Sequence, residues 1–448
     1  MENIKNYFYT LLHSCLSLYI QPQNSVLEIH PQHNQLINMF RKQRVAILLR
    51  GQECAVTFQD TSVPVIPDVG EIKSWNPDYI LLNGNIHYET DIQRLLEQLH
   101  AVCEPATRLL IVYYNSLWTP LIRLATRLHL RYKTPEQNWI GDADIDNLLS
   151  LAGFESVRRD HRVLIPIYIP LFSYFMNRYL APLPFFNLFT MTSLLVARPI
   201  FETRQESSLS SVSVVVAARN EAGNIENVIT RLPKMGPEDE LIFVEGHSTD
   251  STWELIQKMA QKYQGTRNIK TAQQSGEGKG DAVRKGFQLA SKEILMILDA
   301  DLTVPPEDLP KFYRAITSGK GEFINGSRLV YPMEKQAMRF WNILGNKFFA
   351  TAFSFVLGQK LKDTLCGTKV LRRENYLKIA EHRSYFGDFD PFGDFDLLFG
   401  ASRLGLKIVE IPVTYKERTY GETNIQRWRH GAMLFRMLFF AARRIKFI

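Results

Sequence analysis

The sequence predicts an α/β protein built from two domains. A chain of 448 residues exceeds what one hydrophobic core ordinarily serves. Short apolar runs alternate with helix-like segments in both halves, which is the pattern of parallel sheets with crossover helices. A polar, Ser-rich stretch, ETRQESSLSS (202–211), separates two strongly apolar regions and predicts a linker. We therefore expect domains at residues 1–201 and 212–430, followed by a basic, apolar tail at 431–448.

Composition restricts the class of protein. The chain is 45% hydrophobic and 22% charged, which is typical of a folded globular protein rather than a disordered one. Its net charge of +7 is compatible with anionic ligands or a membrane surface. No run of five basic residues marks a nucleic-acid-binding arm, so nucleic acid is not an expected partner. The scattered cysteines have no metal-ligand spacing and indicate a reducing compartment.

The expected strands and helices follow from apolar runs and helical periodicity. In the first half, strands are expected at 44–49, 79–82 and 109–113, and a helix at 91–102. In the second half, strands are expected at 212–217, 241–244 and 294–298, and helices at 221–232, 251–262 and 280–291.

The segment ILMILDADLTVPPE (294–307) carries the clearest chemical signal. Its apolar run delivers Asp299 and Asp301 to the end of a buried strand, and two prolines stop the chain directly afterwards. Oxygen ligands at a strand end suit Mg²⁺ or Mn²⁺ held against a diphosphate. Other Asp-x-Asp pairs occur in the chain, but only this one follows five consecutive apolar residues. Asp299 and Asp301 are therefore the expected metal ligands.

Polar side chains also follow the two earlier strands of the second half. Glu221 comes after the first, and Glu245 and Asp250 come after the second. In open parallel sheets, ligands bind beyond the carboxyl ends of the strands. We therefore expect these acids and the Asp299–Asp301 pair to form one site.

Seven segments occur in an order that resembles a known family. They are AARNEAGNIENVI (217–229), VEGHSTDST (244–252), GEGKGDAVRKGF (276–287), ILDADLTVPPEDL (297–309), GSR (326–328), DTLCGTKVLRRE (363–374) and FDLLFGASRLGLKIVEIPVTYKERTYGETNI (395–425). Together they resemble a family 2 glycosyltransferase of the dolichyl-phosphate mannose synthase type. The resemblance implies a GT-A fold, a UDP- or GDP-sugar donor, a divalent cation, and direct inverting transfer of a hexose to a polyprenyl or dolichyl phosphate.

The resemblance also implies roles for individual residues on the donor side. Glu221 and Glu245 can accept hydrogen bonds from a nucleobase and a ribose, and Asp250 can do the same or cap the next helix. Lys279 lies in a Gly-rich loop, where it can face a phosphate. Arg418 is placed near the donor diphosphate, where its charge would stabilise the departing group. The full set expected to bind the donor is Ala218, Asn220, Glu221, Glu245, Asp250, Lys279, Asp281, Asp299, Ala300 and Asp301.

On the acceptor side, the resemblance places Arg328 and Arg339 at the lipid phosphate. Asp394 and Asp396 would supply a general base if the acceptor were a hydroxyl group of a glycan. A phosphate acceptor is already an anion and needs no strong base, and the two acids would then cap a helix or bind Arg418. Transfer to a glycan hydroxyl therefore remains an alternative function.

Residues 76–118 and 138–157 of the first half resemble the later part of a class I methyltransferase, a Rossmann-like α/β domain. The first strand of such a domain should end in a Gly-x-Gly loop, which S-adenosylmethionine approaches closely. With 44–49 taken as that strand, the following loop, RGQECAV, contains only Gly51. We therefore expect a degenerate domain. An S-adenosylmethionine-dependent methyltransferase with a sugar-nucleotide-binding second domain is the remaining alternative.

Two segments are candidates for membrane contact. Residues 163–197 are nearly uncharged but are interrupted by prolines, which favours a domain-closing or interfacial segment over a spanning helix. The tail mixes an apolar core with arginines, which is typical of a helix lying on anionic headgroups; a helix docked on the core is the other interpretation. A peripheral position on the cytosolic face of a membrane is the resulting expectation.

Overall fold

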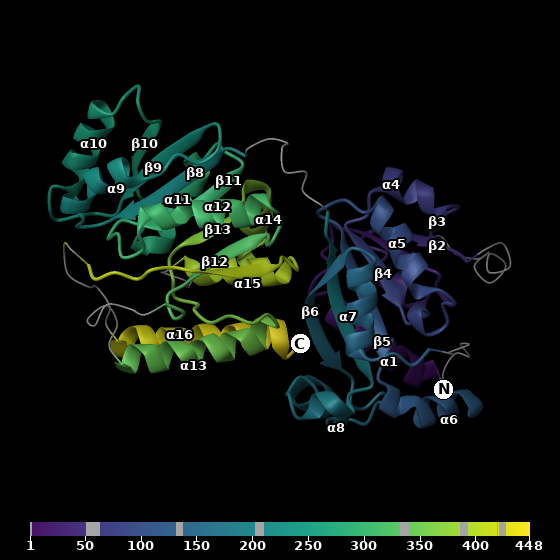
Figure 1. Ribbon diagram of the computed structural model, residues 1–448. Helices are drawn as coiled ribbons and strands as arrows, with labels where there is room; N and C mark the ends of the chain where they lie inside the picture. Colours follow the sequence, from purple (N-terminus) through teal and green to yellow (C-terminus); the bar gives the residue numbers. More distant parts are fainter. Residues whose placement is uncertain are drawn as a thin grey trace. The chain divides into compact units, whose positions relative to one another are not determined.

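The chain folds into two compact units. The computed structural model describes residues 2–50, 63–130, 138–201, 210–331, 340–385, 393–418, 420 and 427–448. Unit 1 comprises Met1–Glu202 together with Ile445–Ile448, and unit 2 comprises Thr203–Arg444 (Figure 1). Most of the expected linker, 202–211, lies outside the described residues. The last four residues therefore belong to the first unit.

Unit 1 is built on a mixed seven-stranded sheet of order β3-β2-β1-β4-β5-β7-β6. Strands β1 to β5 run parallel, whereas β7 is antiparallel to both of its neighbours. This arrangement is compatible with the expected Rossmann-like domain. The strands are β1 (Ser25–Ile29), β2 (Arg44–Leu48), β3 (Val65–Ile66), β4 (Tyr79–Asn83), β5 (Arg108–Tyr114), β6 (Phe154–Arg162) and β7 (Thr192–Pro199).

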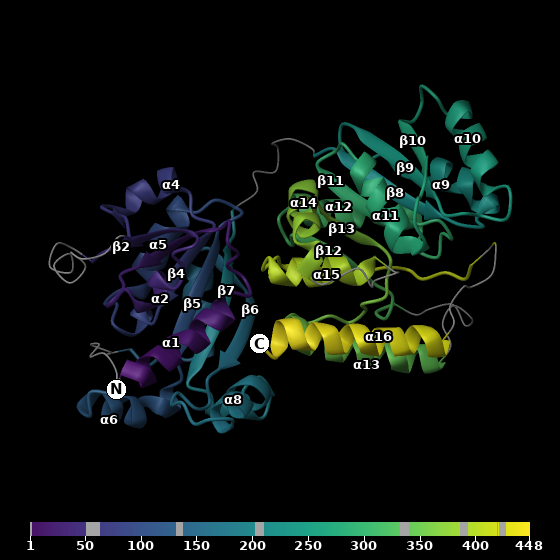
Figure 2. The ribbon, with the colours of Figure 1, turned by 180° about the vertical axis from the view of Figure 1, so that it is seen from behind.

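In the described residues, seven α-helices and several short helical turns accompany this sheet (Figure 2). The helices are α1 (Glu2–Leu16), α2 (Gln35–Asn38), α4 (Ile72–Trp75), α5 (Ile92–Val102), α6 (Thr119–Arg127), α7 (Asp142–Leu151) and α8 (Phe172–Phe175). The short turns are η2 (Val69–Glu71), η3 (Asn85–His87), η4 (Ser116–Trp118), η5 (Met176–Leu180) and η6 (Phe186–Phe189).

The expected first strand of unit 1 was wrong. The segment at 44–49 forms β2, and β1 (Ser25–Ile29) precedes it in the chain. The sequence does not predict β1 because Glu28 interrupts its apolar run. In the structure the Glu28 side chain is fully buried and accepts a hydrogen bond from the Asn83 amide. Burial raises the pKa of Glu28 to about 8, so the strand carries a neutral acid at pH 7. The loop after β1 reads His-Pro-Gln-His and contains no glycine, while Gly51 lies outside the described residues.

Unit 2 carries a second mixed sheet, of order β10-β9-β8-β11-β13-β12-β14. Strand β13 is antiparallel to β11 and β12, and the other pairs are parallel. The strands are β8 (Val212–Ala218), β9 (Asp239–Glu245), β10 (Ile269–Gln273), β11 (Ile294–Asp299), β12 (Phe323–Ser327), β13 (Lys369–Arg372) and β14 (Ile408–Pro412).

The helices of unit 2 cover both faces of its sheet. Side chains of α9, α10 and α12 share a buried core with Val212, Val214 and Val216 of β8. On the other face, α11 packs so closely that a Cβ at Gly286 would lie 2.2 Å from Val215. The helices are α9 (Ile225–Arg231), α10 (Thr252–Lys262), α11 (Gly278–Leu289), α12 (Leu309–Thr317), α13 (Phe340–Leu357), α14 (Arg373–Glu381), α15 (Asp394–Arg403) and α16 (Arg427–Ala441). The short turns are η7 (Ala222–Asn224), η8 (Pro306–Asp308) and η9 (Arg383–Tyr385), and η10 (Ala442–Lys446) begins in unit 2 and ends in unit 1.

The expected strands of the second half are confirmed as β8, β9 and β11, and the expected helices as α9, α10 and α11. In the first half, β4, β5 and α5 are confirmed as well. No helix in the described ranges combines the length and apolar character that crossing a bilayer requires.

Candidate active site

The carboxyl ends of β8, β9 and β11 meet at one edge of the unit 2 sheet. These strands are parallel neighbours, and the register pairs Ala217 with Asp299 and Ala218 with Glu245. The acids that follow the three strands are therefore brought to one edge, as the sequence predicted. Asn220, His247 and Leu302 adopt positive φ angles of 56° in the loops after these strands, and Asn220 is bonded across to the β9 loop by Thr249 N–H. The loops after β8 and β9 are thus joined into one rim.

Arg418 connects the ends of β8 and β11. Its Nη1 lies 3.0 Å from Glu221 Oε1, and its Nη2 lies 2.8 Å from Asp301 Oδ2. On the same strand end, Lys279 Nζ lies 2.5 Å from Asp299 Oδ1. The two aspartates expected to hold a cation are therefore each paired with a side-chain cation.

Burial and neighbouring charge act on these groups in different ways. Burial would raise the pKa of Asp299, but Lys279 lowers it below its ordinary value. The pKa of Lys279 is raised despite burial because it faces Asp299 and Asp394. Burial raises the pKa of Glu221 to about 7, although Arg418 and Asn224 act against this shift. Glu221 therefore titrates near neutral pH, whereas Asp299 stays ionised.

Gly367 and Lys369 belong to the site, and sequence reasoning gave them no role. A Cβ at Gly367 would lie 2.2 Å from Asp299 Oδ2 and 2.3 Å from Lys279 Nζ, so only glycine leaves room for this ion pair. Lys369 is fully buried, and its Nζ lies 3.3 Å from Asp394 Oδ1. Both residues stand in the segment DTLCGTKVLRRE, where Gly367 and Lys369 flank Thr368 just before an apolar pair, and their place in this family-like segment is the signal that could have found them.

Asp394 and Asp396 both lie in the first turn of α15, as the sequence predicted, but they face different partners. Asp394 is 5% exposed and pairs with Lys369. Asp396 pairs with Arg383 at 3.1 Å and lies 3.7 Å from Arg284. The Asp394 carboxylate therefore serves as the counter-ion of a buried lysine.

The remaining acids on the donor side hold the loops. Glu245 is 2% exposed and accepts hydrogen bonds from Ser248 N–H and the Gln273 amide. Asp250 accepts hydrogen bonds from the backbone of Thr252 and Ala222 and from the Tyr420 hydroxyl. Asp281 accepts one from Gly276 N–H at 2.8 Å. These carboxylates fix the rim before any ligand binds.

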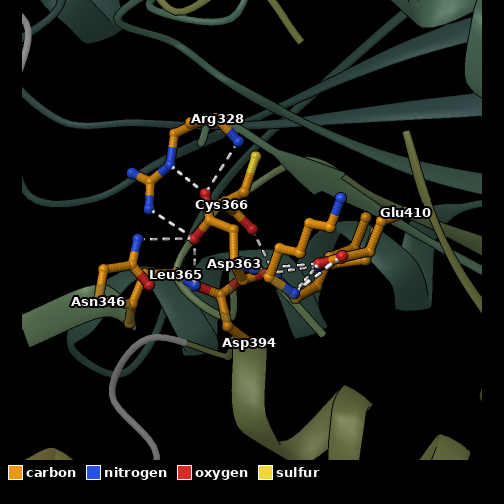
Figure 3. A network of polar contacts seen from close by, with 10 residues as sticks. Arg328, Asn346, Asp363, Leu365, Cys366, Asp394 and Glu410 are labelled. Atoms are coloured by element: carbon orange, nitrogen blue, oxygen red, sulfur yellow. Dashed lines mark hydrogen bonds and ion pairs between the residues drawn. The ribbon is translucent and has the colours of Figure 1, made fainter. Parts of the chain in front are cut away.

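Arg328 is held in a buried network with Asp363 and Asn346 (Figure 3). Its Nε and Nη2 lie 2.7 and 2.8 Å from the two carboxylate oxygens of Asp363, which also accepts a hydrogen bond from Asn346. Despite burial, Arg328 lowers the pKa of Asp363 to about 2. The guanidinium is thus neutralised by a side chain. Arg339, the other expected acceptor ligand, lies outside the described residues.

The carboxylate oxygens of Asp299 and Asp301 suit a hard divalent cation that is bound together with phosphate. Asp299 and Asp301 offer oxygen atoms only, and their side chains are 26% and 17% exposed. Among the described residues, no group of three or more His, Cys, Asp or Glu side chains converges as a protein-made metal cage. Mg²⁺ and Mn²⁺ commonly take one or two protein carboxylates and complete their coordination with phosphate and water. The residues therefore fit such a cation.

Comparison with known proteins identifies the family. The family model "Glycosyl transferase family 2" matches residues 213–379. A dolichol-phosphate mannosyltransferase of Pyrococcus furiosus is 31% identical over 48% of this chain, which spans 59% of that relative's length. Two Haloferax volcanii proteins are similar. Glycosyltransferase AglJ is 30% identical over 51% of this chain and 71% of its own length, and a dolichyl-phosphate hexose transferase is 29% identical over 51% and 92%. The GT-A-like α/β fold and the glycosyltransferase class that the resemblance implied are confirmed, and the chain belongs to glycosyl transferase family 2.

Proposed function

We propose that this enzyme transfers a hexose, with inversion, from a UDP- or GDP-sugar to a polyprenyl or dolichyl phosphate on the cytosolic face of a membrane. The observation that carries the proposal is the alignment of Lys279, Arg418 and the Asp299–Asp301 pair at one sheet edge. The names of two relatives, one of them spanned over 92% of its length, support a lipid phosphate as the acceptor.

The chemistry of the donor side follows from charge. Asp299 and Asp301 would hold Mg²⁺ or Mn²⁺, which would neutralise the donor diphosphate. Lys279 and Arg418 pair with these two aspartates, and a diphosphate would compete for the two cations. Fixed positive charge stabilises a departing nucleoside diphosphate most in a site that excludes water. Glu221, Glu245 and Asp250, with Ala218 and Asn220, would line the nucleoside end, and Asp281 and Ala300 would support the phosphate side.

The acceptor side favours a phosphate over a glycan hydroxyl. A hydroxyl acceptor would require a carboxylate free to take its proton. Asp394 is instead buried against Lys369, and Asp396 is paired with Arg383. A lipid phosphate needs neither as a base. A phosphate at Arg328 would have to displace Asp363 from a buried, bidentate pair, so we infer that Arg328 shapes the site rather than binding the acceptor.

We also propose that unit 1 does not methylate. The loop after β1 reads His30-Pro31-Gln32-His33 and lacks the glycines that would let S-adenosylmethionine approach the backbone. Thermal shift with S-adenosylmethionine tests this directly. Stabilisation by this ligand without any metal would revive the methyltransferase alternative.

The test of the proposed function is a transfer assay with radiolabelled donor and extracted lipid. The wild-type enzyme should move label into the organic phase only with Mg²⁺ or Mn²⁺ present. The D299A/D301A variant should lose at least about 10²-fold in rate, because it removes the site for the charge that offsets the diphosphate. The D142A/D144A variant, with the same spacing of acids on α7 of unit 1, is the matched control. Label that stays in the aqueous phase would refute the lipid acceptor, and wild-type rates in D299A/D301A would refute the site.

A further inference from the structure

Unit 1 exposes an apolar surface formed by residues 117–128 and 167–189, called here the aromatic surface. Nineteen large apolar side chains are exposed in the described part of unit 1, and fifteen of them lie in these two segments. Leu171 is 85% exposed and Phe185 is 71% exposed. Folded proteins rarely leave so large an apolar patch in water unless it contacts a partner or a membrane. The clustering therefore indicates a docking function.

The two segments form one continuous surface. Trp118 Nε1 donates a hydrogen bond to Phe189 O at 2.8 Å, and the Asn115 amide donates one to Leu188 O at 3.0 Å. A cavity of about 500 Å³ is walled by residues of both segments, among them Leu121 of α6, Leu128 directly after it, and Ile167. In Figures 1 and 2, α6 and α8 lie at the same end of unit 1.

The charges of the aromatic surface are all of one sign. Residues 115–130 and 163–191 contain no aspartate or glutamate. Arg123 and Arg127 are exposed on α6. Arg178 lies over the rings of Tyr174 and Tyr179, with its guanidinium carbon 5.4 and 5.9 Å from their centroids. Exposed Phe, Tyr and Leu interleaved with arginine match the boundary between acyl chains and anionic headgroups.

We propose that the aromatic surface docks unit 1 on the surface of a bilayer that contains anionic lipids. The inference rests on the proposed function in one respect, because a lipid phosphate acceptor resides in such a bilayer. It also goes beyond the family, since the family match begins at residue 213 and unit 1 lies outside it. Docking by short helices and aromatic side chains requires no spanning segment, because the apolar groups need only reach the level of the headgroups.

The experiment measures binding of the full chain to vesicles without any donor present. Vesicles of phosphatidylcholine alone and of phosphatidylcholine with phosphatidylserine are sedimented with the wild type, L128E/F185E and L151E. Leu128 and Leu151 are both 56% exposed, but Leu151 lies outside the aromatic surface, which makes L151E the matched control. The partition coefficient onto anionic vesicles should fall at least about tenfold in L128E/F185E and remain within about twofold of wild type in L151E.

A variant that removes positive charge tests whether the arginines of the aromatic surface contribute to binding. R123Q/R127Q should weaken binding to anionic vesicles by about tenfold while leaving the weaker binding to phosphatidylcholine unchanged. R94Q, at an exposed position on α5, is its control. Equal losses in R94Q and R123Q/R127Q would overturn the electrostatic part of the proposal.

A third measurement does not depend on a disruptive substitution. An environment-sensitive dye on L171C should shift its emission to the blue when anionic vesicles are added, whereas the same dye on L151C should not. No shift at position 171, or wild-type vesicle binding by L128E/F185E, would overturn the proposal. The proposal would also be overturned if the wild type were a dimer, and if L128E/F185E made it monomeric without changing vesicle binding. The aromatic surface would then be an interface between two copies of the chain. Transfer to a detergent-dispersed, short-chain lipid phosphate separates this outcome from failure of the proposed function, since that assay needs no bilayer.

Discussion

Glu221 and Gly367 show how single residues set the properties of the site. Glu221 is a buried acid that shares Arg418 with Asp301, and Gly367 leaves room for the Lys279–Asp299 pair because it has no side chain. One residue acts through its proton and the other through its lack of a side chain. Each leads to a separate prediction.

The stability of unit 2 should depend on the proton of Glu221. Burial raises the pKa of Glu221 to about 7 from the ordinary 4.5. Between these values the folded state holds a proton that the unfolded chain has released, so the contribution of Glu221 to the free energy of unfolding falls as pH rises, by at most about 3 kcal/mol. Hydrogen exchange of the β8 amides, compared between wild type and E221Q from pH 4.5 to 8, measures this change. Parallel pH profiles in the two proteins would contradict the prediction.

Replacing Gly367 with alanine should disable the enzyme without unfolding it. The added Cβ would lie 2.2 Å from Asp299 Oδ2, so the carboxylate and Lys279 must move apart. We expect at least a tenfold loss of kcat and weaker activation by Mn²⁺, because a small displacement of a charge-stabilising group is costly. G345A is the control, since a Cβ at Gly345 of α13 meets nothing within 4 Å. Normal kcat and normal Mn²⁺ dependence in G367A would contradict the prediction, because they would show that the Lys279–Asp299 pair can accommodate the added Cβ.

At the scale of elements, the strand ends could be predicted and the loops between them could not. Asp299 and Asp301 were found because a parallel sheet sends its carboxyl ends to one edge, whatever the loops do. The pairing of Arg328 with Asp363 depends on how the chain returns to β13, and no local pattern encodes it. Strand β1 was missed because a burial-neutralised Glu28 looks polar in a sequence.

One face of helix α16 packs on unit 2, as one of the two interpretations of the tail expected, and binding of the tail to a membrane stays a prediction. Met437 is fully buried, whereas Phe439 is 73% exposed. Ring contacts of Phe435 with Phe348 and Phe349 pack α16 against α13. One face of the helix therefore belongs to the fold, and the other offers aromatic side chains beside exposed Arg436 and Arg443.

Two substitutions on α16 should therefore have opposite consequences. M437D should destabilise unit 2 by about 3 kcal/mol or more, because it places a charge in an apolar contact. F439E should leave thermal unfolding unchanged and lower binding to anionic vesicles, because it alters only the exposed face. Calorimetry and vesicle sedimentation of both variants measure the two effects. If M437D left the stability of unit 2 unchanged, or if F439E unfolded it, the assignment of the packed and exposed faces of α16 would be wrong.

At the scale of the whole molecule, the chain passes between the two units at both ends of unit 2. Residues 445–448 return to unit 1, where Ile445 is fully buried and Lys446 Nζ lies 3.0 Å from Asp160 Oδ1. Arg162 donates a hydrogen bond to Lys446 O at 2.7 Å, and the neighbouring cations hold the pKa of Asp160 well below its ordinary value despite complete burial. The sequence predicted two domains but not this return, because a four-residue segment carries no periodic pattern.

Deletion of residues 445–448 should weaken unit 1 and spare unit 2. Loss of the buried Ile445 and of the Lys446–Asp160 pair should cost unit 1 about 3 kcal/mol. Hydrogen exchange should accelerate at β6, which carries Asp160 and Arg162, and remain unchanged at β8 and β11. Uniform acceleration in both sheets, or none at all, would contradict this expectation.

The return of residues 445–448 also fixes an order of events during synthesis. Domains ordinarily fold as units as they leave the ribosome, starting from the amino terminus. Here Asp160 of the edge strand β6 cannot form its ion pair until Lys446 has been synthesised, 286 positions later in the chain. Unit 2 therefore emerges while the charge cluster around Asp160 is still incomplete, and a nascent chain stalled before residue 445 presents an unfinished first unit to chaperones and proteases.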